Sequence, residues 1–216
     1  MLRRAAAAEF TGTALLLAAV AGSGIMGERL ADGNAAIALL ANSLATGGAL
    51  FALITTFAPI SGAHFNPLVS LAVAGRGEMP WRWVPAYLAA QATGAVAGVA
   101  AANLMFGLAA VEASLHARSG PALLFAEAVA TFGLLAVVQG GGRAAAVAAY
   151  ITGAYWFTSS TSFANPAVTV ARSLTDTFCG IRPADVPGFV AAQVAGAAIA
   201  FGFFRWLQAK PSEAKA

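Results

Sequence analysis

The chain has 216 residues, of which 59% are hydrophobic and 10% are charged, and its formal net charge at pH 7 is +3. This composition is far more apolar than that of soluble domains, so it predicts a membrane protein. Basic runs interleaved with aromatic residues do not occur in the sequence, and we therefore expect no nucleic-acid partner. The single cysteine, Cys179, excludes an intrachain disulfide and a cysteine-based metal cluster. We interpret it as a small buried hydrophobic residue rather than a redox group. We expect no cofactor and no metal.

Six apolar stretches follow one another along the chain, and a membrane-spanning helix needs about 20 such residues. They cover roughly residues 5–25, 35–58, 84–107, 121–139, 144–160 and 187–207. The first stretch follows Arg3 and Arg4 and superficially resembles a signal peptide, but Glu9 interrupts it and the same pattern returns later. The predicted fold class is therefore an all-α membrane protein with six transmembrane helices.

The distribution of cations predicts the orientation in the bilayer, because Lys and Arg in short loops are retained on the cytoplasmic side. With both termini inside, the cytoplasmic cations are Arg3, Arg4, Arg76, Arg82, Arg143, Arg205, Lys210 and Lys215. The outer cations are Arg29, Arg118, Arg172 and Arg182. We expect a multi-pass protein of the cell inner (plasma) membrane with cytoplasmic termini, and a short disordered polar tail over residues 210–216.

The chain contains an internal duplication. AEFTGTALLLAAV at 8–20 matches AEAVATFGLLAVV at 126–138, and VPAYLAAQATGA at 84–95 matches VPGFVAAQVAGA at 186–197. Each copy holds three spans, an odd number, so the copies enter the membrane from opposite sides as an inverted repeat. We predict one channel-like domain over 1–216, with repeats at about 5–107 and 121–208.

Two Asn-Pro segments, SGAHFNPLVSLAVAG at 61–75 and SFANPAVTVARSL at 162–174, are too short to cross a bilayer. Asn is a strong helix N-cap and Pro suits the first helical position, so each segment predicts a short helix that begins at its Asn-Pro. Two such half-helices would meet at their N-termini, and their dipoles would repel cations at the centre of a pore. The two Asn amides would donate hydrogen bonds to a passing oxygen.

These motifs resemble the aquaporin, or major intrinsic protein, family, and the resemblance covers essentially the whole chain. Its marks are AEFTGT at 8–13, Asn66-Pro67-Leu68 within SGAHFNPL, Asn165-Pro166-Ala167, and the repeated Gln91 and Gln193 segments. The resemblance implies an aquaporin fold with six spanning helices and two re-entrant half-helices. It also implies a passive channel rather than an enzyme, assembled in the lipid bilayer as a homotetramer with one pore per chain.

The resemblance also assigns roles to three intramembrane residues. Glu9 and Glu127 would accept hydrogen bonds from the re-entrant segments and hold them in place, which we favour over proton relay. His64 would either brace the segment before Asn66 or line the pore. Leu68 stands where relatives often have Ala, and we expect it to alter packing more than selectivity.

Counting from the motifs places the outer constriction at Thr46, Gly153, Ser162 and Val168. Water-selective relatives carry Phe, His and Arg at the equivalents of 46, 153 and 168, and all three are absent here. Small uncharged groups predict a wide constriction whose hydroxyls bind solute hydroxyls. Together with residues 175–189, they resemble the bacterial aquaglyceroporin-like branch associated with arsenic resistance. The expected solutes are glycerol-like polyols, metalloid hydroxides such as arsenite, and water.

Arg172 allows two interpretations. It lies one helical turn beyond Val168, so its guanidinium would either overhang the outer vestibule or pair with Asp176 on a wet surface. Four other functions are weighed against the solute channel, and one of them is a purely structural junction protein, which would show no solute flux. The remaining three involve transport or catalysis. They are a mainly water-conducting aquaporin, a secondary transporter that couples ions through Glu9 and Glu127, and a membrane enzyme, which the separation of His64 and His116 makes improbable.

Overall fold

A computed structural model gives the fold of the chain and describes residues 1–209; the tail predicted to be disordered, 210–216, lies outside the described residues. Its helices in chain order are α1 (Leu2–Leu30), α2 (Ala35–Ser61), α3 (Pro67–Gly75), α4 (Val84–Met105), α5 (Pro121–Gln139), α6 (Ala144–Phe157), α7 (Pro166–Arg172) and α8 (Val186–Leu207). Two single-turn 3₁₀ helices, η1 (Trp81–Trp83) and η2 (Pro183–Asp185), precede α4 and α8. The described residues contain no strand, which confirms the all-α prediction.

Five of the helices, α1, α2, α4, α5 and α8, are long and apolar enough to cross a membrane. The remaining apolar helix, α6, has 14 residues and is shorter than the predicted stretch 144–160. It is about 21 Å long, less than the ~30 Å thickness of a bilayer core. It ends at Phe157 because Thr158 is extended and the chain then turns into the second re-entrant segment.

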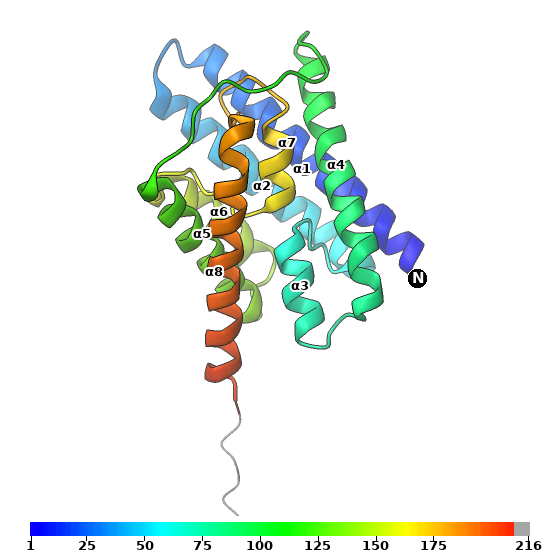
Figure 1. The fold of residues 1–216 in the computed structure, drawn as a ribbon. Helices are drawn as coiled ribbons and strands as arrows, with labels where there is room; N and C mark the ends of the chain where they lie inside the picture. Colours follow the sequence, from blue (N-terminus) through cyan, green and yellow to red (C-terminus); the bar gives the residue numbers. More distant parts are fainter. Residues whose placement is uncertain (210–216) are drawn as a thin grey trace, which may run out of the picture.

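The two repeats form matching halves of the bundle (Figure 1). In the first half α1 packs against α2 and α4, in the second α5 packs against α6 and α8, and contacts between α2 and α6 join the halves. The half-helices α3 and α7 lie between the halves and approach the middle from opposite sides (Figure 1). The inverted arrangement expected from the internal duplication is therefore present.

Equivalent glycines let the helices of each half approach closely. A Cβ at Gly94 would lie 2.4 Å from the carbonyl oxygen of Phe10, and a Cβ at Gly196 would lie 2.2 Å from that of Ala128. Small residues at such crossings allow van der Waals contact between backbones, which drives association where apolar burial cannot. The matching contacts explain why the duplicated segments keep glycine at this place.

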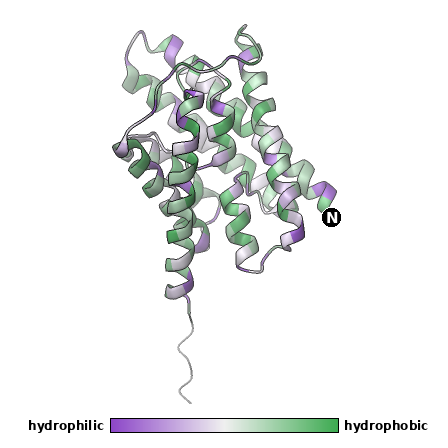
Figure 2. Cartoon of the chain, viewed as in Figure 1, coloured by the Kyte–Doolittle hydropathy of each residue, from purple (hydrophilic) through white to green (hydrophobic). Residues whose placement is uncertain are grey.

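Hydrophobic residues dominate the middle of the helices, while hydrophilic ones gather toward the two ends and the connections (Figure 2). At one end, Arg76 Nη1 and Gln208 Nε2 both donate to the carbonyl oxygen of Gln139, at 3.2 and 3.0 Å. At the other end, Arg29 Nη2 donates to the carbonyl oxygen of Phe106 at 3.1 Å. The connections at each end are thus tied together by polar contacts.

Candidate functional site

Both half-helices begin at their Asn-Pro pairs. Asn66 Oδ1 accepts a hydrogen bond from Leu68 N at 2.9 Å, and Asn165 Oδ1 accepts from Ala167 N at 3.0 Å and Val168 N at 3.3 Å. Each proline occupies the first helical turn, where its missing N–H leaves no unpaired donor. The predicted caps and starting points are confirmed.

The chain that leads into each half-helix has an unusual backbone. Ala63 and Phe65 have φ of 51° and 48°, and their repeat equivalents Ser162 and Ala164 have φ of 52° and 49°. A left-handed backbone at a residue with a Cβ costs roughly 1–2 kcal/mol, so the surroundings must hold these residues in place.

Glu9 holds the first segment. Its Oε1 accepts hydrogen bonds from Ser61 Oγ at 2.6 Å and His64 N at 2.9 Å. Its Oε2 accepts from Phe65 N at 2.7 Å and Gln91 Nε2 at 2.8 Å. The carboxylate is fully buried, and these donors satisfy a group that is otherwise costly at membrane depth.

Glu127 makes the equivalent contacts in the second repeat. Its carboxylate accepts from Phe163 N at 2.9 Å, Ala164 N at 2.9 Å and Gln193 Nε2 at 2.6 Å. Gln193 Nε2 also lies 2.8 Å from Thr169 Oγ1, which ties the carboxylate to the body of α7. Both glutamates therefore contact the backbone they were expected to support.

The tips of the two half-helices are joined crosswise. Asn66 Nδ2 donates to the carbonyl oxygen of Ala164 at 2.8 Å, and Asn165 Nδ2 donates to that of Phe65 at 2.7 Å. An amide NH₂ carries two N–H groups, so each Asn keeps a second donor besides the one used in this link. Each side chain thus fixes the opposite segment and can still meet a solute.

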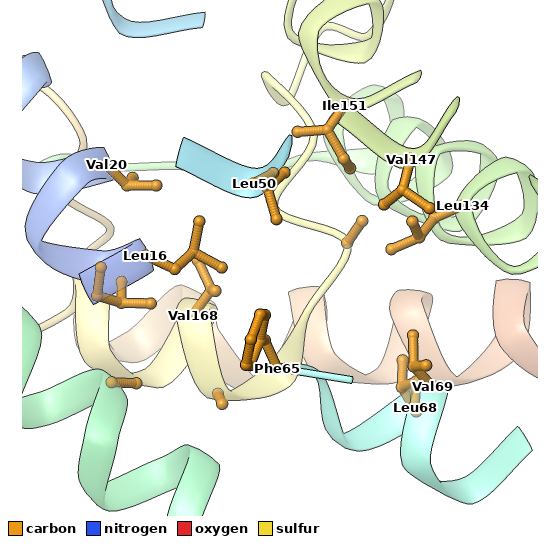
Figure 3. Close-up of a cluster of buried hydrophobic side chains, with 14 of the residues drawn as sticks. Leu16, Val20, Leu50, Phe65, Leu68, Val69, Leu134, Val147, Ile151 and Val168 are labelled. Atoms are coloured by element: carbon orange, nitrogen blue, oxygen red, sulfur yellow. The ribbon is translucent and has the colours of Figure 1, made fainter. Parts of the chain in front are cut away.

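A cavity of about 620 Å³ passes both asparagines. Met79 and Trp83 line it toward one end of the bundle, and Tyr155 and Arg172 line it toward the other. Much of its wall is apolar, and Figure 3 shows how these side chains converge from several helices. They include Leu16, Val20, Leu50, Phe65, Val69, Leu134, Val147, Ile151 and Val168. An apolar wall facing a few polar groups is the usual pattern of a pore for small neutral molecules.

Comparison with known proteins agrees with this architecture. The model of the family "Major intrinsic protein" matches residues 1–141. The aquaglyceroporin AqpS of Rhizobium meliloti (strain 1021) is 52% identical over 212 residues, which cover 95% of this chain and 91% of the relative. The chain belongs to the major intrinsic protein family. The aquaporin NIP1-3 of Oryza sativa subsp. japonica is 47% identical over 83 residues, 38% of this chain and 29% of that protein.

The fold also matches a solved structure of the family, the aquaglyceroporin from Plasmodium falciparum, with a TM-score of 0.73. That match covers 94% of this chain and 96% of the other, at 21% sequence identity. As a member of the major intrinsic protein family, the chain is a multi-pass membrane protein and a passive channel for water and small uncharged solutes.

Three of the four predicted constriction residues, Thr46, Ser162 and Val168, line the cavity. The fourth, Gly153, does not, and that prediction is wrong. Gly153 is exposed, and a Cβ built on it would meet nothing within 4 Å. The residues of α6 that line the cavity are Val147, Ile151 and Tyr155, which share the opposite face of the helix. Counting without gaps fails here because residue 153 lies about 200° around the helix from residues 151 and 155.

Tyr155 is a site residue that the sequence analysis missed. It is 4% exposed, it lines the cavity, and its hydroxyl lies 3.2 Å from Thr46 Oγ1. The signal that could have revealed it is the spacing of Val147, Ile151 and Tyr155, which recurs at every fourth residue and marks one helix face. The part of the cavity beside Thr46 therefore contains a phenol that the predicted constriction lacked.

Arg172 does not pair with Asp176, so that interpretation is wrong. Asp176 Oδ1 instead accepts from Leu115 N at 2.8 Å. Arg172 is 2% exposed, and its Nε donates to the carbonyl oxygen of Cys179, which is itself fully buried as predicted. Arg172 is one of the residues that line the cavity.

The long connection between α4 and α5 crosses the end of the bundle that is predicted to be extracellular, above α7 (Figure 1). Arg118, which the sequence analysis treated only as an outer charge, fixes this connection. It donates from Nε to the carbonyl oxygen of Gly180 at 2.7 Å and from Nη2 to that of Phe178 at 3.3 Å. Burial, and next the neighbouring Arg172 guanidinium, lower the pKa of Arg118 to about 10, so the group remains charged at neutral pH.

His64 and Leu68 flank the first Asn-Pro pair and differ in their surroundings. His64 lines the cavity, and its Nδ1 lies 3.0 Å from Ser70 Oγ, so both interpretations of this residue have a structural counterpart. Leu68 is 5% exposed and packs in the main apolar cluster beside Val69, without lining the cavity (Figure 3). Its position agrees with the expected role in packing.

Proposed function

We propose that this channel conducts small neutral polyhydroxyl solutes, namely glycerol-like polyols and metalloid hydroxides such as arsenite, together with water. The observation that carries the proposal is the outer part of the cavity, where Val168 stands in place of a cation and Thr46 and Ser162 supply hydroxyl groups. Apolar side chains on the facing wall suit the carbon backbone of a polyol, while the hydroxyls replace part of its hydration shell. Arsenous acid is neutral at pH 7 and offers three hydroxyl groups to the same contacts.

Similarity to an aquaglyceroporin that is 52% identical supports the glycerol part of this proposal. We extend the assignment to arsenite on chemistry alone, since a neutral trihydroxy species resembles glycerol in size and in its display of hydroxyls. Passive flow down a gradient then releases arsenite from a cell that produces it.

The proposal also covers the membrane location, the orientation and the oligomeric state of the protein. The cations near the α1 start and in the connections at the same end support cytoplasmic termini in the inner (plasma) membrane, because Lys and Arg are retained inside. Family resemblance supports a homotetramer with one pore per chain. It also supports a single channel domain over 1–216 without enzymatic activity, in which Glu9, Glu127 and His64 support the pore segments.

The rival secondary transporter needs an ion-coupling carboxylate that changes its partners. The carboxylates of Glu9 and Glu127 are each occupied by at least three donors from the pore segments and from glutamine side chains. Releasing either carboxylate would free the strained backbone that it holds, so these contacts favour a static channel.

Stopped-flow light scattering on one preparation of proteoliposomes tests the solute assignment. We expect water, glycerol and arsenite each to equilibrate faster than in protein-free vesicles of the same lipid. Rapid water movement without glycerol or arsenite movement would support the mainly water-conducting alternative and would refute the proposed solutes.

A further inference from the structure

The outer part of the cavity contains a buried guanidinium that the proposed constriction does not use. Arg172 is 2% exposed, lines the cavity, and lies one helical turn beyond Val168 on α7. Its Nε donates to the carbonyl oxygen of Cys179, and its guanidinium carbon lies 3.4 Å from the ring centroid of Phe163.

Within residues 1–209 this cation has no ion-pair partner. The ion pairs in that part of the chain involve Arg76, His116 and Arg182 instead. A buried charge without a counter-charge is costly and is retained where a function requires it. The face of Phe163 offers part of the compensation, because an aromatic face attracts a cation.

The terminal nitrogens of Arg172 make no hydrogen bond within residues 1–209; the only donor in use there is Nε. Since the side chain lines the cavity, both NH₂ groups are available to oxygen atoms of a solute. The carbonyl oxygen of Arg172 accepts from Ile181 N at 3.3 Å, so the backbone that carries the guanidinium is also fixed.

Hydroxyl groups from other elements line the same part of the cavity. Tyr155 hydroxyl and Thr46 Oγ1 lie 3.2 Å apart, and the buried Ser162 Oγ has no partner within residues 1–209. Ser162 is adjacent in sequence to Phe163, the ring on which Arg172 lies. Helix α2, helix α6 and the second re-entrant segment thus each bring a hydroxyl to the cavity that Arg172 also lines.

We propose that Arg172 and Tyr155, together with Thr46 and Ser162, form the selective constriction of this channel. The fixed positive charge is displaced one turn outward from position 168. This assignment rests on the proposed channel function and specifies how that channel selects. The constriction takes neutral solutes that present two or more hydroxyl oxygens, with the guanidinium and hydroxyls as donors. It rejects metal cations by charge, because a fixed positive charge in a poorly solvated passage repels them strongly.

The test compares K⁺ leak and glycerol uptake in proteoliposomes carrying the full chain. We expect Arg172→Met, which keeps much of the side-chain volume, to raise K⁺ leak by about tenfold or more while glycerol uptake persists. Arg172→Lys keeps the charge and is expected to exclude K⁺ as the wild type does. Arg182→Met is the matched control, because Arg182 is an outer arginine paired with Asp185 and does not line the cavity.

Two results would overturn the assignment in different ways. An Arg172→Met channel that conducts glycerol and excludes K⁺ as well as the wild type overturns the role of Arg172 alone. Absence of glycerol uptake in the wild type overturns the proposed solute, and the constriction with it.

A second variant keeps the test decisive if Arg172→Met does not fold. Tyr155→Phe removes only the hydroxyl that meets Thr46, and we expect it to change the ratio of glycerol to water permeability by about threefold to fivefold with K⁺ still excluded. An unchanged ratio would contradict the proposed constriction.

Discussion

Gln193 Nε2 donates a hydrogen bond of 2.6 Å to Glu127 Oε2 at membrane depth, where both side chains are fully buried. The pair connects α8 to α5. The same carboxylate also accepts hydrogen bonds from the backbone N–H groups of Phe163 and Ala164. A strained pore segment is therefore fixed by side chains of two spanning helices.

Replacing this carboxylate tests how much the support matters. Glu127→Gln keeps the shape but turns an NH₂ group toward at least one N–H donor, so we expect the variant to lose about 1–3 kcal/mol of stability. Thermal unfolding in detergent measures the change. Glu112→Gln is the control, because Glu112 is exposed and its side chain makes no hydrogen bond within residues 1–209. Equal unfolding temperatures for the two variants would contradict a supporting role for Glu127.

The close helix crossings predict a second set of stability effects. Gly94→Ala and Gly196→Ala each place a Cβ within 2.5 Å of a backbone oxygen, which forces the helices apart and is expected to cost about 1–3 kcal/mol. Gly202→Ala serves as the matched control on α8, because a Cβ there meets nothing within 4 Å. We expect Gly202→Ala to leave the unfolding temperature unchanged or to raise it slightly, since alanine favours the helix. A similar loss of stability in all three variants would contradict the conclusion that Gly94 and Gly196 are required for close helix packing.

Two neighbouring residues on α3 have different roles, so substitutions at them distinguish packing from permeation. Leu68 is buried in the apolar cluster and Val69 lines the cavity. We expect Leu68→Ala to lower stability by about 2–5 kcal/mol while the ratio of glycerol to water permeability stays at the wild-type value. Val69→Ala is expected to change that ratio, because it widens the passage itself. Calorimetry and stopped-flow scattering on the same preparations distinguish the two effects, and a changed ratio in Leu68→Ala would refute the packing role.

Arg118 holds the connection between α4 and α5 in place. Arg118→Met removes the hydrogen bonds to the carbonyl oxygens of Gly180 and Phe178, so we expect faster amide hydrogen exchange in residues 106–120 and 173–182. Arg182→Met is the comparison, because that arginine is exposed and pairs with a neighbour three residues away. If exchange in these segments is the same in both variants, Arg118 does not fix the connection.

Much of the fold follows from the sequence because its decisive features are local or repeated. Asn-Pro at 66–67 and 165–166 predicts each half-helix from capping chemistry alone, and the duplication predicts that the two tips face each other. Glu9 and Glu127 were identifiable as supports because a carboxylate at membrane depth must find donors. Their glutamine partners, Gln91 and Gln193, lie at equivalent positions of the matched segments 84–95 and 186–197.

The constriction was harder to predict, because it depends on helical phase and on contacts between distant segments. Gly153 was placed by counting residues back from a motif, and the phase of the short α6 brings Tyr155 to the cavity instead. The burial of Arg172 depends on the Phe163 ring, which precedes α7, and on the carbonyl oxygen of Cys179, which follows it. No local pattern encodes these contacts.

The initial rate of glycerol entry into proteoliposomes, measured over a range of glycerol gradients with and without an imposed proton gradient, tests the central claim most directly. A static passage past Asn66 and Asn165 predicts a rate that rises in proportion to the glycerol gradient and does not respond to the proton gradient. A rate that saturates and follows the proton gradient, or a rate equal to that of protein-free vesicles, would contradict it.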